Sequence, residues 1–158
     1  MGLSIRCAGH GNHVLIVQFL KSRPTGELAS LALLPNIEVM RGKETKKFTF
    51  QMNDEEKAEV KREHMVLFDK VKQKCANEHI DLLIFDDFEE LPVIGIPKRM
   101  DCIFLAVCLG GEAHYTVDTE ERTVKANDVI IISEGQVLNN SWFSDDLSGI
   151  AIMMSEDF

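Results

Sequence analysis

The chain has 158 residues, of which 45% are hydrophobic and 27% are charged, and its formal net charge is −9. A globular chain of this length forms one domain or two small ones. The acidic charge argues against nucleic acid as a direct partner, because phosphate contacts need clustered lysine and arginine. No apolar run approaches the ~20 residues of a membrane span, and the first six residues do not resemble a secretory signal. We therefore expect a cytoplasmic protein without a membrane partner.

Cysteine and histidine give no pattern that is typical of a metal site. The cysteines lie at positions 7, 75, 102 and 108, with no CxxC motif and no zinc-like spacing to histidine. His114 stands alone in its predicted strand, and one imidazole does not make a metal site. We expect four buried, reduced thiols and no bound metal.

The first half of the chain alternates between short helical and strand-like patterns. Residues 3–8 and 25–33 have helical patterns, and apolar runs at residues 14–20 and 37–40 predict strands. Strands that alternate with helices are typical of a parallel α/β sheet.

A long helix and a central strand follow. Asn53 and Glu56 form a capping box for a helix over residues 54–77, whose apolar stripe runs from Val60 to Cys75. Residues 80–87 contain four consecutive apolar residues bounded by acids, which predicts a strand buried on both faces. This strand fits the patterns on either side of it, so it is the seam between the two halves.

Polar side chains follow the predicted parallel strands at their carboxyl ends, where such sheets bind ligands. These residues are Arg41, the acid pair Asp86 and Asp87, and the segment from Gln18 to Ser22. Paired acids at a strand end commonly hold Mg²⁺ or act as catalytic carboxylates beside a nucleotide. A solvated strand end is an equally good interpretation.

The second half changes to short strands about ten residues apart, without a helical pattern. This spacing is typical of an antiparallel sandwich or barrel. We expect a two-residue hairpin turn at Gly110 and Gly111. Tyr115 alternates with polar neighbours in the next strand. Tyr115 and Trp142 are candidate pocket residues, although a core position is the favoured interpretation of Trp142.

Five segments of the first half carry a resemblance to a known family. They are GLSIRCAGHG (2–11), VLIVQFLK (14–21), TGEL (25–28), LPNIEV (34–39) and DLLI (81–84). In order and spacing they resemble the P-loop type of corrinoid (cob(I)alamin) adenosyltransferase, over about residues 2–86. That resemblance implies a parallel sheet, a Walker A loop and transfer of the adenosyl group of ATP to the cobalt of a reduced corrinoid.

The sequence departs from that family at the nucleotide site. No G-x-x-x-x-G-K-[ST] motif occurs in the 158 residues, and in the family the loop precedes the helix that residues 2–8 resemble. The resemblance matches Phe48 and Phe50 to the aromatic pair beside the corrinoid, and Asp86 and Asp87 to the acid pair. Ordinary packing is the other interpretation of the two phenylalanines. We expect no cofactor, with ATP, Mg²⁺ and cobalamin implied only if the chain is an adenosyltransferase.

Segments of the second half carry a different resemblance. They are IFDD (84–87), LP (91–92), GEAHYTVDT (111–119), ANDVIIISEGQV (126–137) and GIAIMMS (149–155). They resemble the cupin-like N-terminal sensing domain of AraC-type transcription regulators, over about residues 82–158. That resemblance implies a barrel that binds a small effector, without DNA binding of its own.

Together these patterns predict an α+β composite. A partial, Rossmann-like parallel sheet without its P-loop strand (residues 1–81) precedes an antiparallel cupin-like barrel or sandwich (residues 82–158). The first functional hypothesis is a non-catalytic protein whose barrel binds a small ligand or mediates dimerisation. The alternatives are an active cob(I)alamin adenosyltransferase and an engineered or recombinant scaffold without an evolved function. The incomplete sheet would leave an open edge or an apolar face, so we expect barrel strands or a second subunit to cover it, and a homo-oligomer.

Overall fold

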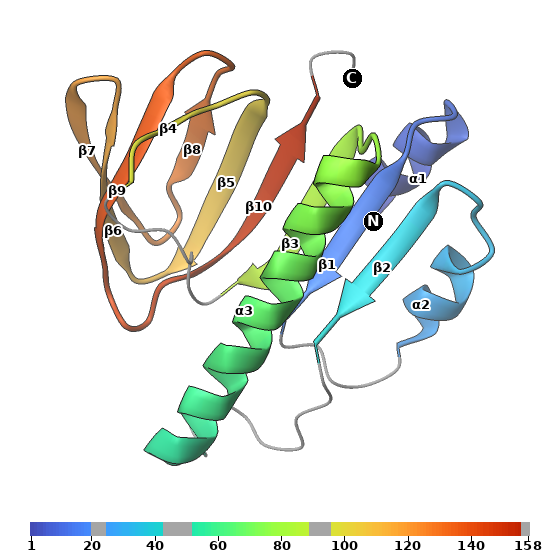
Figure 1. Ribbon diagram of the computed structural model, residues 1–158, viewed down its shortest axis with the longest axis horizontal. Helices are drawn as coiled ribbons and strands as arrows, with labels where there is room; N and C mark the ends of the chain where they lie inside the picture. Colours follow the sequence, from blue (N-terminus) through green and yellow to red (C-terminus); the bar gives the residue numbers. More distant parts are fainter. Residues whose placement is uncertain (20–24, 43–51, 89–95, 156–158) are drawn as a thin grey trace.

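The computed structural model describes residues 1–19, 25–42, 52–88 and 96–155, and these form three helices and ten strands (Figure 1). The helices are α1 (Gly2–Gly9), α2 (Gly26–Leu31) and α3 (Asp54–Asn77). The strands of the first half are β1 (Val14–Gln18), β2 (Ile37–Arg41) and β3 (Leu82–Phe88). Those of the second half are β4 (Lys98–Arg99), β5 (Ile103–Gly110), β6 (Glu112–Val117), β7 (Glu120–Lys125), β8 (Val129–Ile132), β9 (Val137–Phe143) and β10 (Ser148–Met154).

The strands form two sheets, and the larger one is shared by both halves of the chain. Its six strands lie in the order β2-β1-β3-β10-β5-β8, whereas β4, β9, β6 and β7 form a separate antiparallel sheet. The strands β1, β2 and β3 are parallel, and β10 runs antiparallel to both β3 and β5. The fold is therefore the predicted α+β composite, a partial parallel sheet that continues into an antiparallel β structure.

The seam strand β3 pairs with both halves at once. Ile84 lies opposite Ile16 of β1 on one side and opposite Ile152 of β10 on the other. The pairing therefore continues across the sequence position where the two resemblances meet, with one register shift between Gly149 and Ala151. The edge of β3 that does not pair with β1 is covered by the barrel strand β10. This confirms the expectation that barrel strands cover the open edge of the incomplete parallel sheet.

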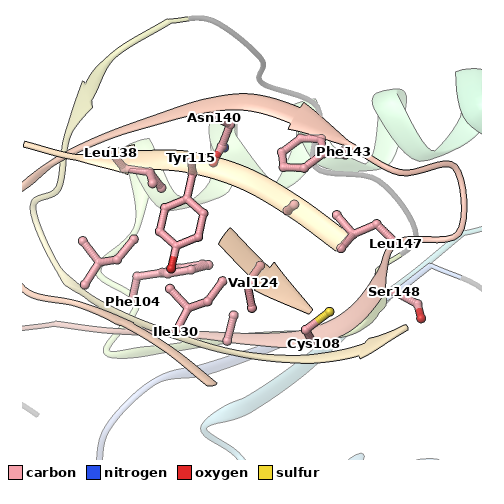
Figure 2. Close-up of a pocket in the computed structure, with 13 residues that line it drawn as sticks. Phe104, Cys108, Tyr115, Val124, Ile130, Leu138, Asn140, Phe143, Leu147 and Ser148 are labelled. Carbon is pink, nitrogen blue, oxygen red and sulfur yellow. The ribbon is translucent and has the colours of Figure 1, made fainter. Parts of the chain in front are cut away.

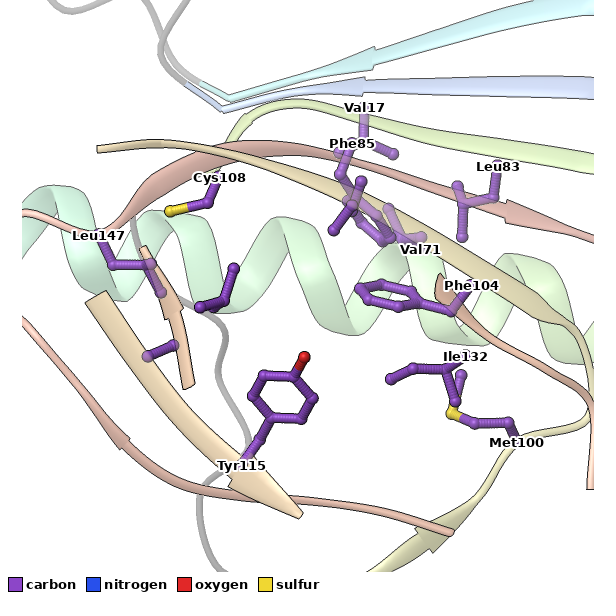
Figure 3. Packing of buried hydrophobic residues seen from close by; sticks show 14 of the residues in the cluster. Val17, Val71, Leu83, Phe85, Met100, Phe104, Cys108, Tyr115, Ile132 and Leu147 are labelled. Atoms are coloured by element: carbon purple, nitrogen blue, oxygen red, sulfur yellow. The ribbon is translucent and has the colours of Figure 1, made fainter. Parts of the chain in front are cut away.

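The two faces of the larger sheet pack against different elements. Alternate residues of β1 separate cleanly: Val14 and Ile16 pack with α1 and α2, whereas Leu15 and Val17 pack with α3. The cluster that contains Leu15 continues into the barrel interior as far as Tyr115, so the two halves share one core (Figure 3). Because strand side chains alternate in direction, α3 lies on the opposite face from α1 and α2.

The long helix α3 matches its prediction closely. Asn53 accepts a hydrogen bond from the Glu56 amide at 2.8 Å, and the Glu56 carboxylate accepts one from the Asn53 amide at 3.1 Å. Leu67 and Val71 are buried against the sheet. The expectation of four buried thiols was wrong for Cys75, which is exposed near the end of this helix, and Cys102 is half-buried.

The predicted hairpin turn at Gly110 and Gly111 is wrong. The strands β5 and β6 belong to different sheets and do not pair, so these glycines form a corner between the sheets. Gly111 has φ +75°, and a Cβ there would lie 2.6 Å from the backbone nitrogen of Leu147. The two glycines correctly indicate a tight change of chain direction. A turn residue does not determine which sheet the next strand joins.

Among the described residues, no helix combines the length and the apolar character needed to cross a membrane.

Candidate functional site

A small cavity of about 40 Å³ lies inside the barrel, between the two sheets (Figure 2). Its walls come from β5 and β8 of the larger sheet, from β6, β7 and β9 of the smaller sheet, and from the loop before β10. The side chains that line it are mainly apolar: Phe104, Ala106, Cys108, Ala113, Tyr115, Val124, Ile130, Ile132, Leu138, Asn140, Phe143, Leu147 and Ser148.

The strand period explains why these residues meet. Residues of β5 alternate, so Phe104, Ala106 and Cys108 point inward while the residues between them point out. In the antiparallel register Ile132 lies opposite Phe104 and Ile130 opposite Ala106, so both isoleucines share the inward face. The cavity is therefore a continuation of the hydrophobic core.

Tyr115 provides the most distinctive polar group of the cavity. Its side chain is 9% exposed, and its hydroxyl points into the cavity (Figures 2 and 3). Burial raises the pKa of the Tyr115 phenol above its ordinary value, so the group stays protonated and can donate.

The second predicted pocket residue, Trp142, lies elsewhere. It is half-exposed on the outer surface of the barrel, and its ring packs edge-on against His114 with centroids 5.2 Å apart. A register shift in the β6–β9 pairing places Trp142 opposite His114 and Asn140 opposite Tyr115. Asn140 and Phe143 therefore line the cavity, and Trp142 does not.

Sequence patterns identified Tyr115 but missed Asn140 and Phe104. The alternation of β6 separates Tyr115 from its polar neighbours, and this signal is local. The direction of Asn140 depends on the irregular β6–β9 register, which no local pattern reveals. Phe104 lies in a nearly continuous apolar run, in which periodicity does not distinguish the two faces.

The carboxyl ends of the parallel strands meet at one edge of the larger sheet, as predicted. In the register Gln18 lies opposite Arg41 of β2 on one side and opposite Asp86 of β3 on the other. Gln18 is 1% exposed. Asp86 and Asp87 fall in β3, but the placement of their side chains lies outside what the structure describes, as do Phe48 and Phe50 altogether. The edge therefore brings the predicted residues into neighbouring strands without defining a site.

Within the described residues, no group of three or more histidine, cysteine, aspartate or glutamate side chains is arranged to hold a metal ion.

The geometry defines a class of protein in which a partial parallel α/β sheet continues into an antiparallel barrel with a small apolar cavity. The family model of the ATP:corrinoid adenosyltransferase BtuR/CobO/CobP matches residues 1–100, well over half of the chain. The chain therefore belongs to this family. No curated protein matches it.

Several solved structures match part of the chain. A putative ethanolamine utilization protein Q of Salmonella typhimurium is 18% identical with a TM-score of 0.35, and the match covers 43% of this chain and 52% of that one. KdgF from Halomonas sp. is 14% identical with a TM-score of 0.39, covering 48% and 71%. An RmlC-like cupin from Shewanella frigidimarina is 17% identical with a TM-score of 0.36, covering 49% and 71%. The match thus spans about half the length of the first of these proteins.

Proposed function

We propose that this chain is a non-catalytic member of its family, and that its barrel binds a small, largely apolar molecule. The observation that carries the first part is the position of β10. It pairs along β3 on the side away from β1, and it runs antiparallel to both of its neighbours, β3 and β5.

The pairing of the strands in the larger sheet argues against adenosyl transfer by this chain. A phosphate-binding loop of the Walker type follows a parallel strand and cradles the phosphates with its backbone amides. Both edges of β1 and both edges of β3 are already paired. Among the described strands, the only open edge of the parallel part is that of β2. A strand added there would lie about 14 Å from β3, three strand spacings away.

A separation of about 14 Å would keep a nucleotide-binding strand away from the acid pair of β3. Asp86 and Asp87 lie in β3, and Mg²⁺ must contact both the acids and the phosphates. Without a phosphate loop beside β3, these acids have no triphosphate to meet. The transfer from ATP then lacks the charge neutralisation on which phosphate chemistry depends.

An adenosylation assay tests this proposal. The purified chain is mixed with Mg-ATP and chemically reduced cobalamin, and adenosylcobalamin is measured by absorbance and chromatography. We expect no product and no shift of the melting temperature with Mg-ATP. The matched control is the double variant Asp86→Asn/Asp87→Asn. Product that forms with the wild-type chain and disappears in the control would overturn the proposal and restore the adenosyltransferase alternative.

The cavity supports the second part of the proposal. The Tyr115 phenol lines the cavity and stays protonated because burial raises its pKa, so it offers a hydrogen-bond donor to a molecule there. The rest of the wall is mainly aliphatic and aromatic, which favours an apolar body. The volume of about 40 Å³ is far below the ~300–1,000 Å³ of typical metabolite sites. These features favour a ligand of a few heavy atoms with one acceptor.

Binding of two probes tests the cavity directly. Xenon needs only apolar space, whereas 1-propanol also offers an oxygen to Tyr115. Chemical-shift changes of the methyl groups of Ile130, Ile132 and Leu147 report on either probe. We expect Tyr115→Phe to weaken 1-propanol binding about three- to tenfold, the effect of one hydrogen bond, and to leave xenon binding unchanged. No shift of these methyl groups with either probe would contradict the proposal.

A further inference from the structure

The interior face of the smaller sheet carries one row of polar side chains between two mainly apolar rows. Tyr115 of β6 lies directly opposite Arg122 of β7 on one side and opposite Asn140 of β9 on the other. Directly opposite residues of an antiparallel pair share one face, so these three side chains form a row, which we call the interior polar row. Tyr115 and Asn140 line the cavity, and Figure 2 shows both on its wall.

The surroundings of the interior polar row are mainly apolar. The next row on one side consists of Val124, Ala113 and Phe143, all of which line the cavity. The next row on the other side contains Val117 and Leu138 and ends at an acid of β7. The larger sheet faces the row across the cavity with four apolar side chains: Phe104, Ala106, Ile130 and Ile132. A polar group of a ligand therefore has its nearest partners within the row itself, and an apolar group has partners around it.

Arg122 places a positive charge at the solvent end of this row. Among the described strands, β7 is an edge of the smaller sheet, and the Arg122 side chain is 47% exposed. Val124, two residues along on the same face of β7, is buried. The row therefore runs from the buried phenol of Tyr115 to a guanidinium that water reaches. A charged group bound there keeps part of its hydration, so the penalty for removing it from water is reduced.

The charge of Arg122 acts on the phenol of Tyr115. Burial is the largest influence on this phenol and raises its pKa, whereas Arg122 lowers the pKa, and Asp128 raises it by less than Arg122 lowers it. The Asp128 carboxylate accepts a hydrogen bond from the Lys125 backbone amide at 2.9 Å. The combined field of Arg122 and Asp128 at the phenol therefore favours negative charge, which is the charge that a bound anion carries.

A carboxylate of the chain already pairs with this guanidinium. Nη2 of Arg122 donates a hydrogen bond to Oε2 of Glu120 at 2.9 Å, and the two residues lie on the same face of β7. The Glu120 side chain is 73% exposed, and exposed ion pairs contribute little to stability. A ligand carboxylate can therefore displace Glu120, and the planar guanidinium suits a carboxylate because it can donate two parallel hydrogen bonds.

We propose that the ligand of the cavity is a short aliphatic carboxylate, with its carboxylate group on the interior polar row and its tail in the apolar cavity. Arg122 neutralises the charge, and the Tyr115 hydroxyl donates a hydrogen bond. The cavity of about 40 Å³ admits only a short tail, so propionate represents the class. The net charge of −9 repels anions at long range, but this repulsion is largely screened at physiological ionic strength. The inference rests on the proposed function, because it names the ligand of the same cavity.

Propionate, propionamide and 1-propanol test the proposal, because they share an ethyl tail and differ in the polar head. Each is titrated into the full chain at constant ionic strength, and the methyl chemical shifts of Ile130 and Ile132 give the dissociation constants. We expect propionate to bind about five- to tenfold more tightly than propionamide, the effect of one charge-assisted hydrogen bond at a partly exposed site. Arg122→Gln is expected to remove this preference and to leave 1-propanol binding unchanged. Glu120→Gln is expected to tighten propionate binding about two- to threefold, because it removes the competing carboxylate.

The matched control is Lys125→Gln, which removes the same charge from the same strand. Lys125 lies opposite Glu112 on the outer face of β7, away from the interior polar row. Propionate binding is therefore expected to stay unchanged in this variant. Far-ultraviolet circular dichroism checks that both variants stay folded, which the exposure of Arg122 and Lys125 favours.

The outcomes separate this inference from the proposed function. If 1-propanol binds the wild-type chain but propionate binds no more tightly than propionamide, the carboxylate inference is overturned and the proposed function stands. Equal weakening of propionate binding by Arg122→Gln and Lys125→Gln would also overturn the inference, because the overall charge and not the interior polar row would then set the affinity. No methyl shift with any of the three ligands would overturn both.

Discussion

The two halves of the larger sheet are covered in different ways. The strands β1, β2 and β3 are sandwiched, with α3 on one face and α1 and α2 on the other. The strands β5 and β8 face the smaller sheet on one side and carry exposed aliphatic residues on the other. One continuous hydrogen-bonded ladder therefore joins a region with two buried faces to a region with one. The difference shows that sheet continuity alone does not decide where a core ends.

The largest effect should come from comparing equivalent isoleucines of the same face. Ile16 of β1 is 1% exposed under the helices, whereas Ile131 of β8 is 61% exposed. Ile16→Ala is expected to lower the free energy of unfolding by about 2–5 kcal/mol, through lost burial and the cavity it leaves. Ile131→Ala should cost under about 0.5 kcal/mol in dilute solution. Urea denaturation measures both, and equal losses would contradict the difference between the two regions.

The corner between the two sheets of the barrel provides the next test. At Gly111, with φ +75°, a Cβ would lie 2.5 Å from the Ser144 hydroxyl and 2.6 Å from the Leu147 backbone. Gly111→Ala should therefore destabilise the chain by about 2–4 kcal/mol, from strain plus the clash. Gly135 has φ +81° but open space around it, so Gly135→Ala should cost only about 1–2 kcal/mol. Thermal unfolding of both variants measures the two losses of stability. Equal losses would mean that the corner at Gly111 tolerates a side chain.

A buried carboxylate holds the start of the sandwiched region together. Asp81 is 7% exposed, and it accepts a hydrogen bond from the His13 backbone amide at 2.7 Å and lies 2.9 Å from Nε2 of His79. Asp81→Ala is expected to cost about 1–3 kcal/mol, because the His13 amide loses its partner. Asp81→Asn keeps one acceptor oxygen and should cost less. If both variants unfold at the wild-type urea concentration, Asp81 does not tie β1 to β3.

The smallest effect is a titration on the outer surface of the barrel. A hydrogen bond from His114 lowers the pKa of Glu112, and Lys125 lowers it further. The contribution of Glu112 to stability is therefore present above its unfolded pKa and is lost as the pH falls through its folded pKa. His114→Ala should raise the pKa of Glu112 toward its ordinary value, and Lys125→Ala should raise it less. Carboxyl NMR titration measures both, and an unchanged pKa in His114→Ala would exclude His114 as the main cause.

Local patterns predicted the elements better than their partners. The capping box of Asn53 and Glu56 marked the start of α3 because it lies within one turn of chain. The strand at residues 80–87 was identified from its apolar run, but its pairing with β10 joins residues about 70 positions apart and has no local signature. For the same reason, the Gly110–Gly111 corner was mistaken for a hairpin.

The candidate cavity shows the same difference between local sequence patterns and long-range strand pairing. Tyr115 followed from the alternation of its strand, whereas Asn140 reached the cavity through a register shift against β6. The side-chain direction of Trp142 depended on that shift too, and the tryptophan lies outside. Sequence patterns therefore locate side chains on regular strands and fail where a bulge reverses the alternation.

The strand β10 pairs with β3 and so joins the two halves of the chain into one sheet. Backbone nuclear Overhauser effects in the full, isotope-labelled chain test this most directly. We expect cross-strand contacts between Ile84 and Ile152 and between Leu83 and Met153, in addition to the contacts of β3 with β1. Contacts of β3 with β1 alone, with β10 paired only to β5, would contradict it and would reopen the edge of β3 to a nucleotide-binding strand.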